Sequence, residues 1–335
     1  MDYKSVKQII RSSLMIPSLD LNFAGTKELD SRITYTRSGN ATCIASNGSI
    51  QTVSANVPRF THDPATGASL GLLIEESKTN LILNSAAPGD AQSITVSAIP
   101  YTISFTGTGT IALSYASTAG PLVGTGTGET NRVSLTFTPT AGTLVVTFSG
   151  DVTYAQLETG SFKTSYIPTN GSTVTRSADV IQITGTNFSS WYNQNEGTIV
   201  VSGVSVNSAT ATILTIDDNS GSNRIYLQRQ SVSSTASGAV VTGGSSVANL
   251  SITGVGSNYN CALSYKVNQF HLSAGGAPVV TDAAAAVTPG NIPTVDRIRF
   301  GVDPSGSSVL ALNGSIARLR YYRRALPNKL QILST

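Results

Sequence analysis

The residues whose types and spacing suggest chemistry lie in one segment, RFTHDPATGASLGLLIEESKTNLILNS, which covers residues 59–85. It places a histidine beside an aspartate, His62 and Asp63, and two carboxylates next to each other, Glu75 and Glu76. A histidine beside a carboxylate is suited to general acid–base work. Two carboxylates that flank a sugar linkage can hydrolyse it. The segment therefore raises the question of an active site.

The surroundings of His62 favour a turn over a catalytic pair. Asp63 is followed by Pro64 and, three residues later, by Gly67. Proline fixes one backbone angle of a turn, and glycine adopts the left-handed conformation that such turns need. Adjacent residues in a turn seldom point at each other, and no nucleophile is recognisable nearby. We therefore predict a structural turn here.

Strand geometry argues against a joint role for the two glutamates. The apolar run LGLLI before Glu75 predicts a strand, in which neighbouring residues point to opposite faces. Glu75 and Glu76 would then stand back to back, and the spacing Glu-x-Asp-x-x-Glu of a sandwich glycosidase is absent. We expect one of them to be buried and paired with Arg59 or Lys78.

A weaker site prediction concerns a cation. Asp217, Asp218 and Asn219, in IDDNSGSNR, offer the oxygen ligands that Ca²⁺ prefers. The same letters also describe an ordinary hairpin loop between the predicted strands ATILT and RIYLQ. Both interpretations stay open.

No other cofactor is expected. The two histidines, His62 and His271, lie far apart, and the two cysteines, Cys43 and Cys261, match no metal or redox spacing. The glycine-rich GTGTG runs do not join a strand to a helix, so they predict no phosphate-binding loop.

Aromatic residues are better candidates for binding. Flat rings with polar edges suit sugars or partner surfaces. The candidates for such contacts, each of which also fits a core position, are Trp191, Tyr192, Tyr226 and Tyr259.

The elements that must position these residues are strands. Alternating apolar residues in YTISF, TIALSY and RVSLTFT, with Gly-, Pro- and Asn-rich breaks between them, predict an all-β fold of two antiparallel β-sandwich or jelly-roll domains in tandem. We place a connector with first strands at 19–95, the first sandwich at 96–180 and the second at 181–335. The Gly/Ala/Ser-rich stretch 231–256 is expected to hold loops and short edge strands.

The first eighteen residues predict a short amphipathic helix. Its apolar stripe is formed by Tyr3, Val6, Ile10 and Leu14, at spacings of three and four, and Pro17 ends it. A helix of this length is marginal alone. It either anchors the chain to a larger particle or docks on its own domain.

Composition limits the partners. Charged residues make up 12% of the chain, about half the usual share, and no apolar run approaches the length of a membrane span. The N-terminus lacks the apolar core and cleavage site of a signal peptide, so we expect synthesis in a cytoplasm. We expect neither a membrane nor a nucleic acid as partner. The basic C-terminal cluster predicts a solvated or subunit-facing strand edge; it consists of Arg318, Arg320, Arg323, Arg324 and Lys329.

Two segments carry a resemblance to a known family. NVPRFTHDPATGASLGLLIEESKTNLILNS and AQLETGSFKTSYIPTNGSTVTRSADV resemble segments of tailed-bacteriophage head-spike, head-fibre and tail-fibre proteins. GSIARLRYYRRALPNKLQIL is similar to the last strand of concanavalin A-like, laminin-G-like domains. The resemblance implies a carbohydrate-binding-like sandwich at 96–180, a concanavalin A-like one at 181–335, and a homotrimer or other symmetric assembly. It implies no catalytic residues.

These observations lead to one hypothesis with two alternatives. We expect a non-enzymatic structural protein on a phage virion surface, anchored to capsid or tail proteins by its N-terminal part and displaying sandwiches for host-surface glycans. The first alternative is a polysaccharide-degrading enzyme that uses Glu75, Glu76 or Glu158. The second is a capsid cement protein that binds no glycan.

Overall fold

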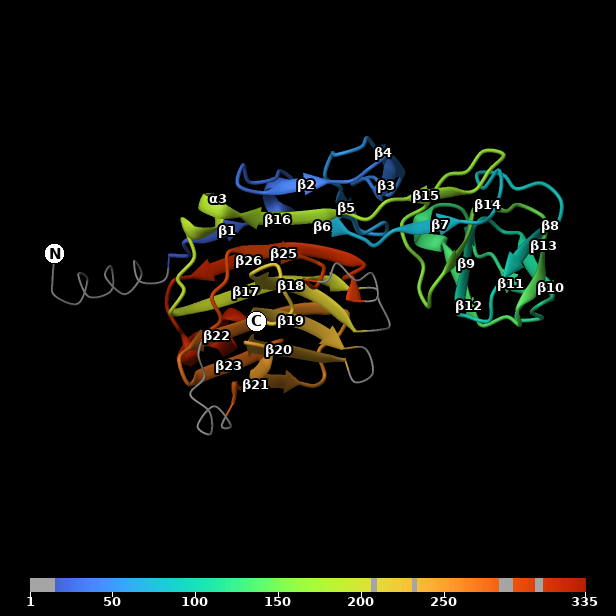
Figure 1. Ribbon diagram of the computed structural model, residues 1–335. Coiled ribbons are helices and arrows are strands. Elements are labelled where there is room, and N and C mark those ends of the chain that lie inside the picture. Colours follow the sequence, from blue (N-terminus) through green and yellow to red (C-terminus); the bar gives the residue numbers. More distant parts are fainter. Residues whose placement is uncertain (1–15, 206–209, 231–233, 283–291, 305–309) are drawn as a thin grey trace.

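A computed structural model describes residues 16–205, 210–230, 234–282, 292–304 and 310–335 (Figure 1). It is built from antiparallel sheets that form two sandwiches, a larger one that holds both ends of the described chain and a smaller one at its side. The predicted all-β fold with two antiparallel sandwiches is confirmed. The helix predicted from Tyr3, Val6, Ile10 and Leu14 lies outside the described residues.

The first sheet of the larger sandwich has eight strands. In order they are β24 (Val280–Thr281), β23 (Gln269–Ala274), β22 (Asn258–Lys266), β17 (Glu196–Ser205), β26 (Gly314–Tyr322), β6 (Ser69–Ile74) and β5 (Phe60–His62), with β1 (Leu19–Leu21) also paired to β26. Strand β26 therefore lies inside the sheet, so the prediction that the basic C-terminal strand is an edge is wrong. Its apolar residues, among them Leu319 and Tyr321, enter the core, while Arg318 turns outward to Asp20 at 2.6 Å.

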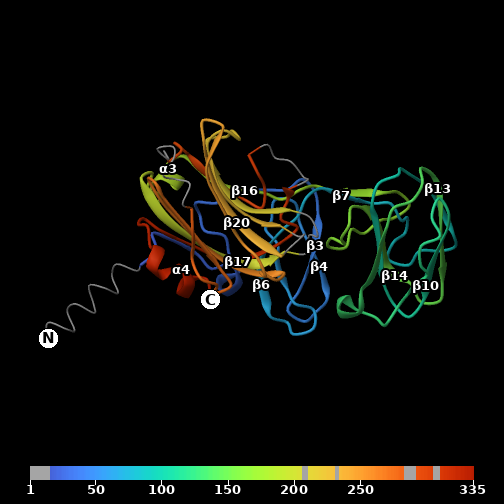
Figure 2. The ribbon, with the colours of Figure 1, turned by 90° about the horizontal axis from the view of Figure 1, so that it is seen from below.

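The second sheet of the larger sandwich has seven strands. They are β2 (Thr34–Thr36), β16 (Val180–Thr184), β25 (Arg297–Phe300), β18 (Ala211–Asp217), β19 (Arg224–Gln230), β20 (Thr235–Thr242) and β21 (Ser245–Ile252). The turned view shows the layer with β16 and β20 above the layer with β6 and β17 (Figure 2). Apolar side chains of both sheets fill the space between the layers, as Ile216, Leu263 and Phe300 do.

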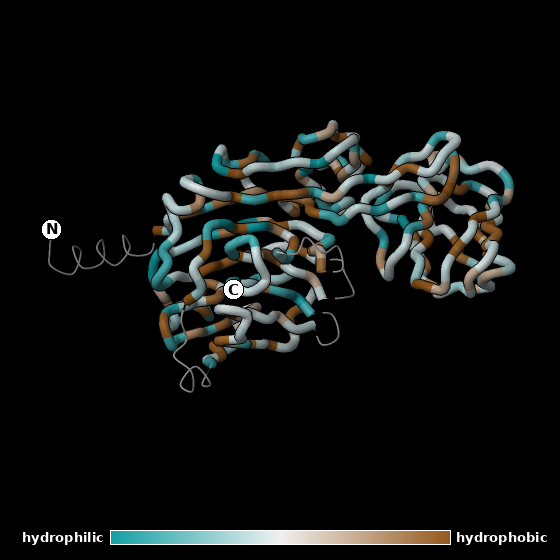
Figure 3. The backbone as a smooth tube through the Cα atoms, in the orientation of Figure 1, coloured by the Kyte–Doolittle hydropathy of each residue, from teal (hydrophilic) through white to brown (hydrophobic). Residues whose placement is uncertain are grey.

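The smaller sandwich has sheets of four and three strands. The four are β11 (Leu122–Val123), β10 (Thr110–Tyr115), β13 (Gly142–Ser149) and β8 (Gln92–Val96); the three are β12 (Val133–Phe137), β9 (Tyr101–Thr106) and β14 (Thr153–Thr159). Its separate core includes Ile103, Phe105 and Leu144. Figure 3 shows apolar residues along the strands of both sandwiches.

The smaller sandwich is an insertion within the larger one. Strands β1, β5 and β6 precede it in the chain and β16 to β26 follow it, yet all belong to the larger sandwich. The chain passes from the larger to the smaller sandwich along β7 (Lys78–Asn80) and returns along β15 (Val174–Arg176). These two connecting strands lie side by side, because they pair antiparallel. The two sandwiches are thus nested and not in tandem as predicted. The stretch 19–95, predicted as a connector with first strands, supplies strands of the larger sandwich, since the apolar run of β6 finds its partner, β26, more than two hundred residues away.

The stretch 231–256 matches its prediction only in part, because β21 is an edge strand but neither β20 nor β21 is short. It forms two eight-residue strands, β20 and β21, joined at Gly243 and Gly244, both with positive φ. Small residues are needed there, since a Cβ on Gly238 would lie 2.9 Å from the Leu263 side chain. Loop-like composition here reflects close packing of strands.

Short elements complete the chain. They are α2 (Phe23–Thr26), the hairpin β3 (Ala41–Ile44) and β4 (Ile50–Val53), η1 (Glu129–Asn131), α3 (Gly185–Ser189), η5 (Pro327–Lys329) and α4 (Leu330–Leu333). The last two form a short helical turn near the C-terminus. Within the described ranges, no helix has the length and apolar character needed to cross a membrane.

Candidate binding site between the two sandwiches

A buried ionic network joins the two sandwiches. The carboxylate of Glu75, at the end of β6, lies 2.7 Å from Arg59 and 2.7 Å from Arg176. Arg59 also pairs with Asp179, which accepts a second guanidinium from Arg37 at 3.3 Å. All five charged side chains are at most 5% exposed. Arginines from before and after the insertion therefore meet at one point.

Ser165 ties the smaller sandwich to this network. It follows β14, and its backbone N–H and hydroxyl donate to Glu75 at 2.7 and 2.6 Å. Burial alone raises the pKa of Glu75, but the charges of Arg176 and Arg59 and the bonds from Ser165 outweigh it and lower that pKa to about 2. Glu75 is therefore ionised at neutral pH, which suits a structural anion and not a general acid.

Glu76 is engaged on the other side of the chain. Its carboxylate lies 3.0 Å from Lys78 and accepts from the Asn313 side chain at 3.1 Å. We expected one of the two glutamates to be buried and paired with Arg59 or Lys78; both are buried, and Glu75 pairs with Arg59 while Glu76 pairs with Lys78. Glu158 is also buried and accepts bonds from Gln156 and Thr164.

The predicted turn at residues 63–67 is confirmed. The Asp63 carboxylate accepts from the backbone N–H groups of Ala65 and Thr66, both at 2.9 Å, and Gly67 has φ +69°. The ring of His62 turns away from Asp63, and its Nδ1 lies 2.9 Å from the carbonyl oxygen of Ile44. A carbonyl only accepts, so Nδ1 carries the proton of the neutral ring and Nε2 keeps a lone pair.

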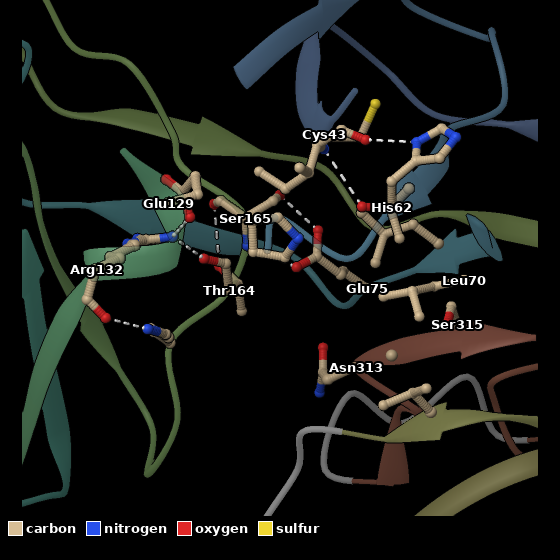
Figure 4. A pocket seen from close by; sticks show the side chains of 17 residues that line it. Cys43, His62, Leu70, Glu75, Glu129, Arg132, Thr164, Ser165, Asn313 and Ser315 are labelled. Atoms are coloured by element: carbon tan, nitrogen blue, oxygen red, sulfur yellow. Dashed lines mark hydrogen bonds and ion pairs between the residues drawn. The ribbon is translucent and has the colours of Figure 1, made fainter. Parts of the chain in front are cut away.

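A cavity of about 260 Å³ opens beside the network, between the two sandwiches (Figure 4). The larger sandwich lines it with His62 from β5 and with Asn313 and Ser315 at the start of β26. The smaller sandwich and the segment after it supply Glu129, Arg132, Lys163, Thr164 and Ser165. We call this the interdomain pocket.

Four residues that line the interdomain pocket each carry a buried polar atom that makes no hydrogen bond within the described residues. These atoms are Nε2 of His62, Oγ of Ser315, Oε1 of Glu129 and Nε of Arg132. A buried polar atom without a partner costs about 1–3 kcal/mol. Because residues with such atoms gather around one cavity from both sandwiches, we take this pocket as the candidate site for a polar ligand.

The wall from the smaller sandwich is basic. The Arg132 guanidinium donates to the carbonyl of Thr164 and to the hydroxyl of Ser104, each at 2.9 Å. Lys163 Nζ donates to the backbone carbonyl of Arg132 at 2.5 Å. Burial, followed by the charge of Arg132, lowers the pKa of Lys163 to about 8.

Cys43 also lines the pocket, but its thiol is a poor nucleophile there. Burial raises the pKa of its thiol, which therefore stays protonated at neutral pH. Both cysteines, Cys43 and Cys261, are free and buried.

A second cavity, of about 480 Å³, lies between the β3–β4 hairpin and residues 166–176. Its lining is mostly neutral, with small residues such as Asn40 and Thr175, and it includes one buried polar atom without a partner, Nε of Arg176. This second cavity therefore has fewer features of a ligand-binding site than the interdomain pocket.

Three of the four predicted aromatic contacts are wrong. Trp191, Tyr192 and Tyr259 are 1%, 6% and 2% exposed, inside the core of the larger sandwich. Trp191 meets the Tyr321 ring edge-on at 5.0 Å, so these rings pack the two sheets together. Only Tyr226 is half-buried; it lies on β19 under the Arg224 guanidinium, 4.9 Å from its ring centre.

The calcium candidates face arginines. The Asp217 carboxylate accepts from Arg299 at 3.1 Å, and the side-chain oxygen of Asn219 accepts from Arg297 at 3.1 Å and from Arg299. Asp218 instead binds Ser220 and Asn223 within its own turn. Guanidinium groups thus occupy the oxygens proposed for Ca²⁺, which favours the hairpin-loop interpretation. Across the described residues, no cluster of three or more His, Cys, Asp or Glu is placed to hold a metal.

The pocket residues of the smaller sandwich were not predicted from the sequence. Glu129 and Arg132 lie in GETNR, a loop without any motif, and Lys163 lies in SFKTSY, within the segment 155–180 whose resemblance to phage fibre proteins implied no site residue. The one available signal was their charge in a chain where charges are scarce.

Comparisons with known proteins leave the family open. No protein-family model matches the chain, and no curated protein is similar to it. Among solved structures, a carbohydrate-binding module (CBM40) of a Ruminococcus gnavus sialidase is 20% identical, with 43% of this chain and 84% of that chain covered and a TM-score of 0.36. The NanB sialidase of Streptococcus pneumoniae is 13% identical, with 46% and 26% covered and a TM-score of 0.37. A pentraxin of Limulus polyphemus is 14% identical, with 42% and 69% covered and a TM-score of 0.31. The likeness is confined to less than half of this chain, and the site described above rests on its own geometry.

Proposed function

We propose that this chain is a non-enzymatic, glycan-binding structural protein of a bacteriophage virion, and that the interdomain pocket is its saccharide site. The observation that carries the glycan part is the set of four unpartnered polar atoms around one cavity, at His62, Ser315, Glu129 and Arg132.

The mixture of these atoms favours a saccharide. His62 Nε2 and Glu129 Oε1 need donors, Arg132 Nε needs an acceptor, and the Ser315 hydroxyl serves as either. A sugar hydroxyl both donates and accepts, so one polyhydroxylated ring can satisfy all four. The cavity of about 260 Å³ is slightly smaller than the roughly 300 Å³ at which pockets for drug-sized ligands begin, and so it suits one small ring.

The engagement of the buried glutamates supports a non-enzymatic role. A glycosidase needs one carboxyl group that gives up a proton near neutral pH. The low pKa of Glu75 keeps that group ionised, and Glu76 and Glu158 are held by Lys78, Asn313, Gln156 and Thr164.

The virion role rests on the resemblance of residues 56–85 and 155–180 to phage head- and tail-fibre segments. In this proposal the N-terminal stretch, with Tyr3, Val6, Ile10 and Leu14, attaches a homotrimer or other symmetric assembly to capsid or tail proteins. Weak individual sites then gain avidity because many copies meet the host surface at once.

Glycan binding is tested with the purified chain and a panel of host-surface oligosaccharides, by isothermal titration calorimetry. We expect Leu70→Trp, which fills the pocket, to abolish binding, and Val123→Trp, a matched change on an exposed residue of the smaller sandwich, to leave it unchanged. If Leu70→Trp does not fold, Ser315→Ala provides the test and should weaken binding about tenfold. Binding that survives both pocket variants but is lost in Tyr226→Ala would move the site to the outer face of β19 and refute the pocket assignment.

The virion role is tested separately by deleting residues 1–18 from the phage gene. Incorporation into particles should be lost while the expressed chain keeps its fold, with antibody labelling of intact particles showing head or tail. Normal incorporation of the truncated chain would contradict anchoring by this stretch.

A further inference from the structure

The charges around the interdomain pocket do not balance. Its lining contains two basic side chains, Arg132 and Lys163, and two acidic ones, Glu75 and Glu129. Glu75 is already neutralised from behind by two arginines at 2.7 Å. That leaves Glu129 as the only lining carboxylate available to two cations.

Glu129 does not neutralise both cations. Its Oε2 lies 3.7 Å from Arg132 Nη1, beyond hydrogen-bond distance, and its Oε1 makes no hydrogen bond. Lys163 makes no ion pair within the described residues, and its ammonium donates only to the neutral carbonyl of Arg132. Among the described residues, the half-buried Lys163 ammonium at the pocket thus has no carboxylate within ion-pair distance, although the charge of Glu129 acts on it from farther away.

We propose that the interdomain pocket binds a saccharide that carries a carboxylate, with Arg132 and Lys163 holding that group. This inference rests on the proposed function and names its ligand class, an acidic sugar of the uronic type. In this proposal the unpartnered Nε of Arg132 and the Lys163 ammonium, which has two further N–H groups, donate to the carboxylate oxygens, while His62, Ser315 and Glu129 bond the ring hydroxyls.

The ionisation of Lys163 gives this proposal a pH signature. In the free protein its pKa lies at about 8, and a bound carboxylate would raise it, because an opposite charge favours the ammonium form. By linkage, affinity for the acidic sugar falls as the pH rises through 8. The other titratable groups at the pocket are Arg132, Glu129, Glu75, His62 and Cys43. A lysine-to-arginine replacement separates Lys163 from these groups, since it keeps its charge at high pH.

The test uses matched probes: a digalacturonate and the neutral disaccharide made by reducing its carboxylates to hydroxymethyl groups. Calorimetry at pH 7.0 should show the acidic probe binding about 10- to 100-fold more tightly, as expected for a charge-assisted hydrogen-bonded pair. At pH 9.5 most of this preference should disappear. Lys163→Met should remove it at both pH values and Lys163→Arg should retain it at both, while Lys266→Met, an exposed control on β22, should behave as the unaltered chain.

The outcomes separate this inference from the proposed function. Equal binding of both probes, lost in Leu70→Trp, would overturn the acidic-sugar inference and leave the glycan site in place. Binding of neither probe at millimolar concentration would overturn the inference, and the oligosaccharide panel would then decide the proposed function. Tighter binding of an acidic dipeptide than of digalacturonate would show that the pocket recognises carboxylates of another source and would also overturn it.

Discussion

The buried network around Glu75 leads to a sharp prediction about stability. Glu75→Gln keeps the size of the side chain but removes the charge that two buried arginines, Arg59 and Arg176, share. Removing one partner of a buried ion pair leaves an uncompensated charge and typically costs about 3–5 kcal/mol.

The pKa of Glu75 gives the same magnitude by a second route. It falls from 4.5 to about 2 in the folded chain, and each unit is worth about 1.4 kcal/mol, so the ionised group contributes about 3 kcal/mol at neutral pH. Because the folded pKa is the lower one, this stability is present above pH 4.5. It is lost as the pH falls from 4.5 through 2.

Urea unfolding measured from pH 7 down to pH 2 checks both numbers. Glu75→Gln should be less stable by about 3 kcal/mol at pH 7, and the difference should shrink below pH 4.5 until the two curves meet near pH 2. Glu28→Gln, a change to an exposed glutamate, should track the unaltered chain throughout. Parallel curves for Glu75→Gln and the unaltered chain across the whole range would refute the reasoning.

Two further predictions concern the loop at residues 217–219 and the packing of β6. Removing divalent cations with EDTA, or adding millimolar Ca²⁺, should leave the midpoint temperature of thermal unfolding unchanged, because arginines already bond the side-chain oxygens of Asp217 and Asn219. A calcium-dependent rise of several degrees in that midpoint would contradict this. Gly71→Ala should lower the free energy of unfolding by about 2–3 kcal/mol in the same urea assay, since Gly71 has φ +91° and an added Cβ would lie 2.2 Å from the Ile316 carbonyl oxygen. Gly89→Ala is the control and should leave the free energy of unfolding unchanged, because an added Cβ there meets no described atom within 4 Å.

Sequence periodicity predicted the class of fold because alternation is a local property of each strand. Pro64 and Gly67 predicted the turn at Asp63, and nearby charges predicted that one of the two glutamates pairs with Arg59 or Lys78, since these features depend on residues close in the chain. The nested order of the sandwiches could not be predicted from the sequence, because the pairing of β6 with β26 depends on which distant strand completes the sheet. Local patterns carry no information on that choice.

The aromatic predictions failed for a related reason. A tyrosine has the same sequence pattern in a core as on a binding face, and which it becomes depends on the face of the sheet from which its side chain projects. Tyr259 lies in the core between the two sheets, whereas Tyr226 is half-buried on the outer face of β19. The charged residues of the interdomain pocket were missed because loops far apart in the sequence, at Glu129 and Lys163, build one wall only after the smaller sandwich has folded.

The network and the pocket are not independent features. Glu75 holds the backbone N–H and hydroxyl of Ser165, and the residues just before it, Lys163 and Thr164, form the basic wall together with Arg132. A wall that carries an uncompensated positive charge needs to be fixed in place, because the repulsion between its cations would otherwise move them toward water. The buried anion of Glu75 provides that fixed point. In the proposed function, the carboxylates of residues 59–85 therefore position the saccharide site without contacting the saccharide, and loss of Glu75 should weaken saccharide binding through the geometry of Lys163 as well as destabilising the fold.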